Sequence, residues 1–369
     1  MDIDIDNIHL SKEEGTHVAV IENKAYRINS VFYKVLSTLN TGIPIEDAIR
    51  NVATETGIDY HVLLNKFTTF IKKAHKIKDK SYIRFKHIII KEKVVNRIAY
   101  SLTFLYTSLV FAILLFTCII TNIVFLCRNY NLLDGISCPT FEIGFVIFLG
   151  YLLSLIIHEI GHATATMSIG RRAKEIGFGF YMMFPVFYTD VTSAWNMKKK
   201  ERILVNIGGI YFQLIVNTIV IVILSLFPQY AWIKALNGLV ISNAFVVVIS
   251  ITPFFRNDGY WILSDYWGIP NLLKKSDYTL LHLFDHPRNK STKDINRLML
   301  FGLANNLFRI YILVCLALNI QKNLTDIIGH TYQNRIPNIL ISIVFSIIGI
   351  YMILASYYKM LRHEGQNGY

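Results

Sequence analysis

From about residue 95 onward the chain is dominated by apolar runs long enough to cross a lipid bilayer, and this feature limits its fold most strongly. A spanning helix needs about 20 apolar residues. Only 17% of the residues are charged, whereas soluble domains carry about a quarter. We therefore expect a multi-spanning α-helical membrane protein with about six transmembrane helices. The six segments lie at 97–127, 141–169, 203–227, 237–266, 298–319 and 337–358.

The basic residues, which give a net charge of +12, gather beside these apolar runs. Two connections between the runs, 170–202 and 267–297, are rich in Lys and Arg, and the other connections hold far fewer. By the positive-inside rule, these two connections and the N-terminus are cytosolic. The bilayer accounts for the clustered positive charge, so we expect no nucleic-acid partner.

Residues 1–90 differ from the rest, because they mix charge with short apolar stretches as a small soluble domain does. The stretch "HVAVIENKAYRIN" (17–29) predicts two strands around a tight turn. Helical spacing follows at 30–42, 44–57 and 59–76, with Ser30 as the first N-cap and Gly42 just past that helix. We expect a cytosolic α+β domain with a winged-helix outline over 1–90 and a membrane domain over 95–360.

Three polar side chains interrupt the second apolar run, in "LSLIIHEIGHATATMSIGRR" (153–172). His158 and His162 stand at i and i+4, so a helix presents both on one face, where they can bind one metal ion. Glu159 lies beside them as a general base. Imidazole ligands suit Zn²⁺, which lowers the pKa of a bound water toward about 7. Because ionisable groups inside a membrane are costly, this interpretation is favoured over histidines that only hydrogen-bond to neighbouring helices.

A catalytic zinc ion takes a third protein ligand, and "SITPFFRNDGYWILSDYWGIPNL" (250–272) offers Asp258. Pro253 precedes it and interrupts the helix, which can turn the carboxylate toward the histidines. Asp265 and Asp190 are rival carboxylates that lack this context. For Asp190, a structural hydrogen bond is the other interpretation.

The stretch 176–195 is too apolar for a solvated loop and too broken by Gly and Pro for a spanning helix. Irregular backbone at membrane depth is tolerated only where protein or a water-filled cavity satisfies its polar groups. We therefore expect a re-entrant strand or hairpin that dips toward the histidines.

The sequence "HEIGH" in one span, with Pro253 through Asp258–Gly259 in a later one, resembles the site-2 protease family of intramembrane zinc metalloproteases. The resemblance implies that His158, His162 and Asp258 are zinc ligands and that Glu159 is the catalytic base. It also implies a site below the cytosolic surface that water can reach.

The same resemblance places 176–195 at the family's membrane-embedded hairpin and "NIGGIYFQ" (206–213) at its small-residue core helix. Small residues such as Gly208 and Gly209 let helices approach closely; substrate contact is the other interpretation for them.

The chain departs from the family pattern at one position. Family members often carry Asn eight residues before the ligand aspartate, where this chain has Ser250. Asn243, two turns earlier on roughly the same face, can substitute as the donor to substrate. Ser250, Asn243 and Asp190 are thus candidate substrate-binding residues.

The sequences "FYTDVTSAW" and "NDGYWILSDYWGIPNL" are similar to those of the peptide-maturation branch of this family. That branch comprises the peptide zinc metalloproteases found beside bacterial peptide-biosynthesis genes. The N-terminal module, through "YRIN", "SVFYKVLSTLNTG" and "IEDAIRNVATETG", resembles the peptide-recognition domain of ribosomally made, modified-peptide pathways. These resemblances imply a multi-pass protein of the bacterial inner membrane. Its partner would be a precursor or leader peptide, such as that of a bacteriocin or pheromone.

Several alternatives stay open from the sequence. The chain can instead perform regulated cleavage of a membrane-bound signalling protein or signal-peptide remnant, or serve as a non-catalytic scaffold for peptide export or immunity. The N-terminal module can be a stabilising cap. Cys127 and Cys138 flank a short external loop and either form a disulfide or remain thiols. His282 and His286 are expected to be ordinary surface histidines.

Overall fold

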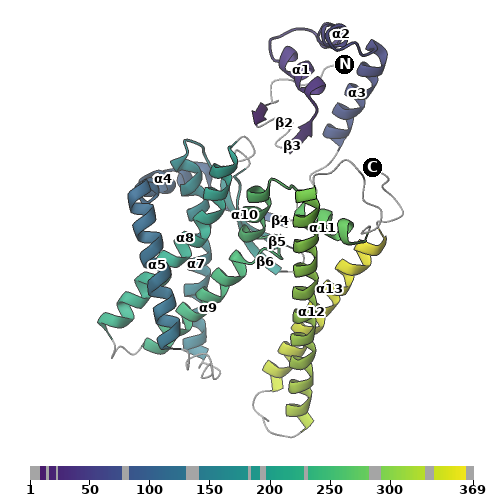
Figure 1. Ribbon diagram of the computed structural model, residues 1–369. Helices are drawn as coiled ribbons and strands as arrows, with labels where there is room; N and C mark the ends of the chain where they lie inside the picture. Colours follow the sequence, from purple (N-terminus) through teal and green to yellow (C-terminus); the bar gives the residue numbers. More distant parts are fainter. Residues whose placement is uncertain are drawn as a thin grey trace. The chain divides into compact units, whose positions relative to one another are not determined.

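The structure is a computed structural model, and Figure 1 shows its helices and strands. The described residues are mostly helical and contain two three-stranded sheets. The chain divides into two compact units, Met1–Tyr266 and Trp267–Tyr369. The structure describes residues 9–13, 16–21, 24–76, 83–129, 141–181, 184–191, 197–227, 232–281, 292–328 and 336–362.

The N-terminal region contains the predicted hairpin and three helices. Strands β2 (Thr16–Ile21) and β3 (Lys24–Ile28) pair antiparallel, with His17 opposite Ile28. A further strand that the sequence did not predict, β1 (His9–Glu13), pairs with β2 on its other side. The helices are α1 (Ser30–Leu39), α2 (Ile45–Thr56) and α3 (Tyr60–Lys76).

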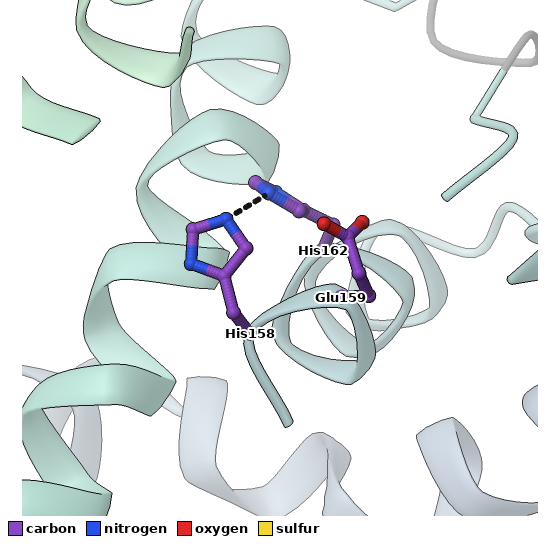
Figure 2. Close-up of side chains that lie close together, drawn as sticks. All are labelled: His158, Glu159 and His162. Atoms are coloured by element: carbon purple, nitrogen blue, oxygen red, sulfur yellow. Dashed lines mark hydrogen bonds between the residues drawn. The ribbon is translucent and has the colours of Figure 1, made fainter. Parts of the chain in front are cut away.

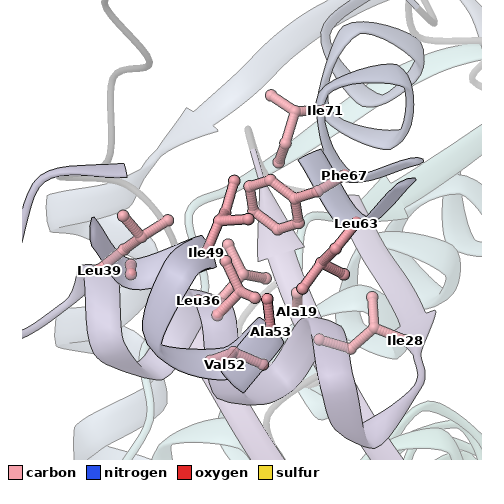
Figure 3. Close-up of a cluster of buried hydrophobic side chains, with 12 residues drawn as sticks. Ala19, Ile28, Leu36, Leu39, Ile49, Val52, Ala53, Leu63, Phe67 and Ile71 are labelled. Carbon is pink, nitrogen blue, oxygen red and sulfur yellow. The ribbon is translucent and has the colours of Figure 1, made fainter. Parts of the chain in front are cut away.

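These elements enclose a hydrophobic core of their own, shown in Figure 3. The Phe32 and Phe67 rings meet edge to face with centroids 5.5 Å apart, which joins α1 to α3. A winged-helix classification for this region stays a prediction. The buried core residues are Ala19, Ile28, Val35, Leu36, Leu39, Ala48, Ile49, Val52, Ala53, Leu63, Phe67 and Ile71.

The N-cap of α1 is Asn29, so the prediction of Ser30 is wrong by one residue. Asn29 has extended backbone, at φ −77° and ψ 169°, and its side-chain oxygen accepts a hydrogen bond of 2.7 Å from the Phe32 amide. Ser30 already has helical geometry. An N-cap must be extended for its side chain to reach back to the first-turn amides, so Asn29 takes the role.

Within the described residues, five helices are long and apolar enough to cross a membrane. This supports a membrane-embedded protein. The sixth predicted segment, 337–358, falls in α13 (Ile336–Arg362), whose apolar run Ser342–Ala355 is shorter, so a count of six stays a prediction. The five helices are α5 (Ser108–Arg128), α7 (Phe141–Ser168), α8 (Lys199–Leu226), α9 (Ile233–Ile251) and α12 (Thr292–Ile328).

Two predicted spans are interrupted. The first, 97–127, divides into α4 (Glu92–Leu102), a 3₁₀ turn (Thr103–Tyr106) and α5. That turn carries Tyr106, whose hydroxyl donates to the Gly161 carbonyl of α7 at 3.0 Å. The segment 237–266 divides into α9 and α10 (Asp258–Trp267), because Pro253 follows the end of α9 and cannot continue a helix.

Helix α8 is the centre of the first unit's helix bundle. It packs against α5, α7 and α9 (Figure 1), and 61% of its most apolar 18-residue stretch is buried inside the protein. At its closest approach to α7, a Cβ built on Gly208 would lie 2.7 Å from the Gly161 carbonyl oxygen. The two backbones therefore meet almost directly, as small residues in membrane helices allow.

The stretch 176–195 contains an antiparallel hairpin, β5 (Glu175–Tyr181) and β6 (Phe184–Thr189). Strand β4 (Ile83–Lys91) pairs with β5, which gives the sheet order β4-β5-β6. Residues from both sides of the boundary that we placed at 90–95 therefore share one sheet. That the hairpin re-enters the membrane stays a prediction.

The second unit contains α11 (Leu272–Leu281), α12 and α13, and a partly buried ion pair joins the first two helices. Arg309 Nη2 of α12 lies 3.4 Å from Asp277 Oδ2 of α11. The guanidinium also lies over the Tyr357 ring of α13, at 5.3 Å from its centroid. Burial raises the pKa of the Asp277 carboxyl, and the Arg309 charge opposes that rise. Each charge thus relies on its partner for stabilisation.

We expect Arg309→Met alone to destabilise the second unit by about 3 kcal/mol, because it leaves the Asp277 carboxylate without its partner. The double variant Asp277→Leu with Arg309→Met removes both charges and should recover most of that loss. Thermal unfolding of the full-length protein in detergent measures both. Equal stability of the single and double variants would contradict this account of the pair.

Candidate metal centre

Helix α7 presents His158, Glu159 and His162 together. All three side chains are buried, each residue being 8% exposed. One ligand atom from each lies within 4.8 Å of the others. Figure 2 shows the two imidazole rings close together, with a dashed line joining a nitrogen of each, and the Glu159 carboxylate beside them. The one-turn spacing predicted from the sequence therefore brings these side chains to one place.

In both imidazoles Nδ1 lies against a hydrogen-bond acceptor on α8, and Nε2 points toward the other ring. His162 Nδ1 lies 2.7 Å from the Val205 carbonyl oxygen and His158 Nδ1 lies 3.0 Å from Gln213 Oε1, both partners being on α8. A backbone carbonyl only accepts hydrogen bonds, so His162 Nδ1 carries the proton. In a neutral imidazole the other nitrogen, Nε2, then carries a lone pair.

The inward nitrogens converge with a carboxylate from another helix. His158 Nε2 and His162 Nε2 are 3.0 Å apart (Figure 2), and Asp258 Oδ2 and Oδ1 lie 3.1 and 3.5 Å from them, respectively. Three electron-rich groups directed at one space repel each other unless a cation lies among them. Two imidazoles and a carboxylate are a donor set that zinc takes in catalytic sites. The residues present therefore fit a zinc ion.

Asp258 reaches this place because the chain breaks before it. Helix α9 ends at Ile251, and α10 begins with Asp258 itself. A Cβ on Gly259 would collide with the Ile251 carbonyl, so only glycine allows this tight return. About two turns further on, Asp265 accepts a hydrogen bond of 2.9 Å from Arg202 Nε of α8. This rival carboxylate therefore ties α10 to α8, away from the histidines.

The hairpin contacts Glu159. The Thr189 hydroxyl, at the end of β6, lies 2.7 Å from Glu159 Oε2 and 2.9 Å from the Glu159 backbone carbonyl. One carboxylate oxygen of Glu159 is thereby held by β6. Asp190 follows directly, and its backbone extends the ladder through the Lys174 amide and the Glu175 carbonyl, both at 2.9 Å.

Space for the imidazoles depends on Gly209. A Cβ there would lie 2.5 Å from His158 Nε2 and 2.6 Å from His162 Nε2, closer than any ordinary contact. Gly208, next to it, faces Gly161 of α7. Both positions therefore serve the packing of α8 on α7, the interpretation that the sequence favoured over substrate contact.

The other predicted candidates have different surroundings. Asn243 is fully buried on α9, with its amide bonded to Ser154, Gln213 and Asn217. Ser250 lies buried near the end of α9. Substrate-binding roles for Ser250, Asn243 and Asp190 remain predictions. His282, His286 and Cys138 lie outside the described residues, so the second histidine pair and the disulfide are untested.

Sequence reasoning missed Gln213, Val205 and Thr189, all of which touch the histidines or the glutamate. Gln213 could have been noticed, because it is a polar residue inside the apolar run 203–227, where polar side chains are costly and mostly functional. In the structure it is fully buried. Val205 acts through its backbone and Thr189 through the fold of the hairpin, so neither leaves a pattern in the sequence.

Comparison with known proteins gives one informative similarity. The chain is 28% identical over 191 residues to "Putative peptide zinc metalloprotease protein YydH" of Bacillus subtilis (strain 168). The alignment covers 51% of this chain and 69% of that protein. No protein-family model matches the chain. No solved structure matches it either.

We expect Gly209→Ala to lose bound zinc, because its methyl group would occupy the space of both Nε2 atoms. Gly150→Ala on α7 is the matched control, since its Cβ would meet only the movable end of the Leu239 side chain. The zinc content of purified protein, measured by mass spectrometry, should fall from about one ion per chain only in the first variant. Full zinc content in Gly209→Ala would contradict the assigned space.

Proposed function

We propose that this chain is a membrane-embedded zinc endopeptidase that cleaves a bacterial precursor or leader peptide. The observation that carries the proposal is the convergence of His158 Nε2, His162 Nε2 and the Asp258 carboxylate, with Glu159 beside them. The similarity to a protein named as a peptide zinc metalloprotease supports a metalloprotease role in general.

His158, His162 and Asp258 would hold the zinc ion. When bound, zinc supplies a Lewis acid that activates water near neutral pH and polarises the scissile carbonyl. Glu159 would accept the proton of the attacking water and pass it to the leaving amine. The Thr189 hydroxyl lies within hydrogen-bond distance of Oε2 and would hold the Glu159 carboxylate in place for this step.

The hairpin offers a way to present the peptide. Strand β6 is an edge of its sheet among the described residues, and its last residue, Thr189, touches Glu159. An extended peptide added to that edge would gain backbone hydrogen bonds and lie beside the catalytic carboxylate. An extended substrate also exposes the carbonyl groups that a helix keeps in internal hydrogen bonds.

The N-terminal region would capture the peptide before cleavage. Its small sheet, with the order β1-β2-β3, has outer strands to which a leader peptide can add. Tethering this sheet to the membrane domain raises the effective concentration of the peptide near the site. We also propose that the protein lies in the bacterial inner membrane. The distribution of Lys and Arg supports an orientation in which the N-terminus and the active site face the cytosol.

We expect Glu159→Gln to reduce peptide cleavage by at least about 100-fold, because it removes the general base. Its zinc content should stay unchanged, whereas His158→Ala should lose both zinc and activity. The test is mass spectrometry of the precursor peptide encoded nearest the gene, co-expressed with each variant. A cleavage product of the same amount with Glu159→Gln would exclude this mechanism. Identical full-length peptide with wild type and Glu159→Gln would favour a membrane-spanning substrate or a scaffold.

Removal of residues 1–76 should weaken binding of the precursor and slow its cleavage at low peptide concentration, with less effect at saturation. Steady-state kinetics of the truncated and full-length proteins in detergent measure this difference. Zinc content serves as the control for an intact membrane domain. Unchanged affinity and rate would show that the N-terminal region is only a stabilising cap.

A further inference from the structure

A group of amide side chains lies buried inside the bundle formed by α5, α7, α8 and α9. Gln213, Asn217 and Asn243 are fully buried, and Asn122 is 6% exposed. Polar side chains are expensive in an apolar bundle. Their hydrogen bonds run in one unbroken series that ends at His158.

Backbone carbonyls determine which way the asparagine amides point. A backbone carbonyl only accepts hydrogen bonds, so the end of a side-chain amide that lies at a carbonyl must be its nitrogen. Asn122 Nδ2 donates to the Cys118 carbonyl at 2.8 Å, and Asn217 Nδ2 donates to that of Val240 at 3.2 Å. Asn243 Nδ2 likewise donates to the Gln213 backbone carbonyl at 3.1 Å.

The orientation of Asn243 then determines that of the Gln213 side chain. Asn243 Oδ1 accepts from Gln213 Nε2 at 3.1 Å and from the Ser154 hydroxyl at 2.7 Å. Gln213 therefore turns its oxygen, Oε1, toward His158 Nδ1 at 3.0 Å. An acceptor at this position requires His158 Nδ1 to carry the proton, which leaves the lone pair on Nε2.

We propose that Gln213 is a positioning residue, oriented by Asn243, which holds His158 in the one tautomer that can bind a metal ion through Nε2. His162 obtains the same tautomer from the Val205 carbonyl. The two imidazoles are therefore held in the same tautomer, His162 by a backbone carbonyl of α8 and His158 by the Gln213 side chain of the same helix. This assignment gives Asn243 an indirect role through Gln213.

The inference rests on the proposed function, because it concerns a ligand of the proposed zinc ion. Hydrogen bonds to the outer nitrogen of a metal-binding histidine raise its ligand strength, and their loss typically weakens metal affinity about 10- to 100-fold. The competing explanation is that these amides only join the helices, as polar side chains do in many membrane proteins.

Two substitutions at Gln213 separate the explanations. Gln213→Glu keeps an oxygen that accepts from His158 Nδ1, whether its carboxyl is charged or neutral. Gln213→Leu is similar in size but offers no acceptor. The proposal predicts zinc affinity about 10- to 100-fold weaker for Gln213→Leu and closer to wild type for Gln213→Glu. A packing role predicts the reverse order, because a carboxyl group is far less favourable than Leu in an apolar bundle.

Asn122→Leu is the matched control for helix association. It removes a buried amide from the same series, yet Asn217 stays fixed by the Val240 carbonyl and Asn243 by the Gln213 carbonyl. This variant should lower thermal stability and leave zinc affinity unchanged. Affinities are measured by chelator competition on the full-length protein in detergent.

The tautomer itself can be read without any variant at Gln213. In zinc-free full-length protein labelled with ¹⁵N-histidine, NMR should show His158 and His162 protonated at Nδ1, with assignment from His158→Ala and His162→Ala spectra. A neutral His158 ring with its proton on Nε2 and none on Nδ1 would overturn the proposal. So would wild-type zinc affinity in Gln213→Leu, or weaker binding by Gln213→Glu than by Gln213→Leu. Absence of zinc binding by wild-type protein would instead overturn the proposed function, and the NMR result would still test the tautomer.

Discussion

Helices α7 and α8 approach each other almost backbone to backbone, where Gly161 faces Gly208 and where Gly209 leaves space for both imidazole rings. This contact brings the Val205 carbonyl and Gln213 Oε1 within hydrogen-bond distance of the two Nδ1 atoms. A wider separation would leave both rings without partners and free to rotate. The geometry of the whole site therefore depends on how closely these two helices pack.

The remaining helices supply what α7 cannot supply alone. The break between α9 and α10 allows Asp258 to approach the histidines, and the ion pair between Asp265 and Arg202 ties α10 to α8. The hairpin brings the Thr189 hydroxyl to Glu159. Asp258 and Thr189 both lie where regular helix is interrupted, and at such points the polar groups of the chain find partners inside the protein.

Local sequence patterns predicted which helices exist better than where those helices begin and end. Helical spacing located α1, α2 and α3, and apolar length located α7 and α8, because both signals lie within one element. The predicted span 97–127 ran through a 3₁₀ turn. In that turn the Tyr106 hydroxyl donates to the Gly161 carbonyl of another helix, a contact that composition does not reveal. The pairing of β4 with β5 was missed for the same reason.

The sequence by itself determined that His158 and His162 share a helix face within an apolar run, with Glu159 beside them, since i and i+4 spacing and hydropathy need no distant contact. Pro253 likewise marked the helix break before Asp258. Only the tertiary structure decided which nitrogens face inward, which side chain orients His158 and where Thr189 lies. Those features depend on atoms of α8, α9 and the hairpin, which meet the histidines only after the helices have packed.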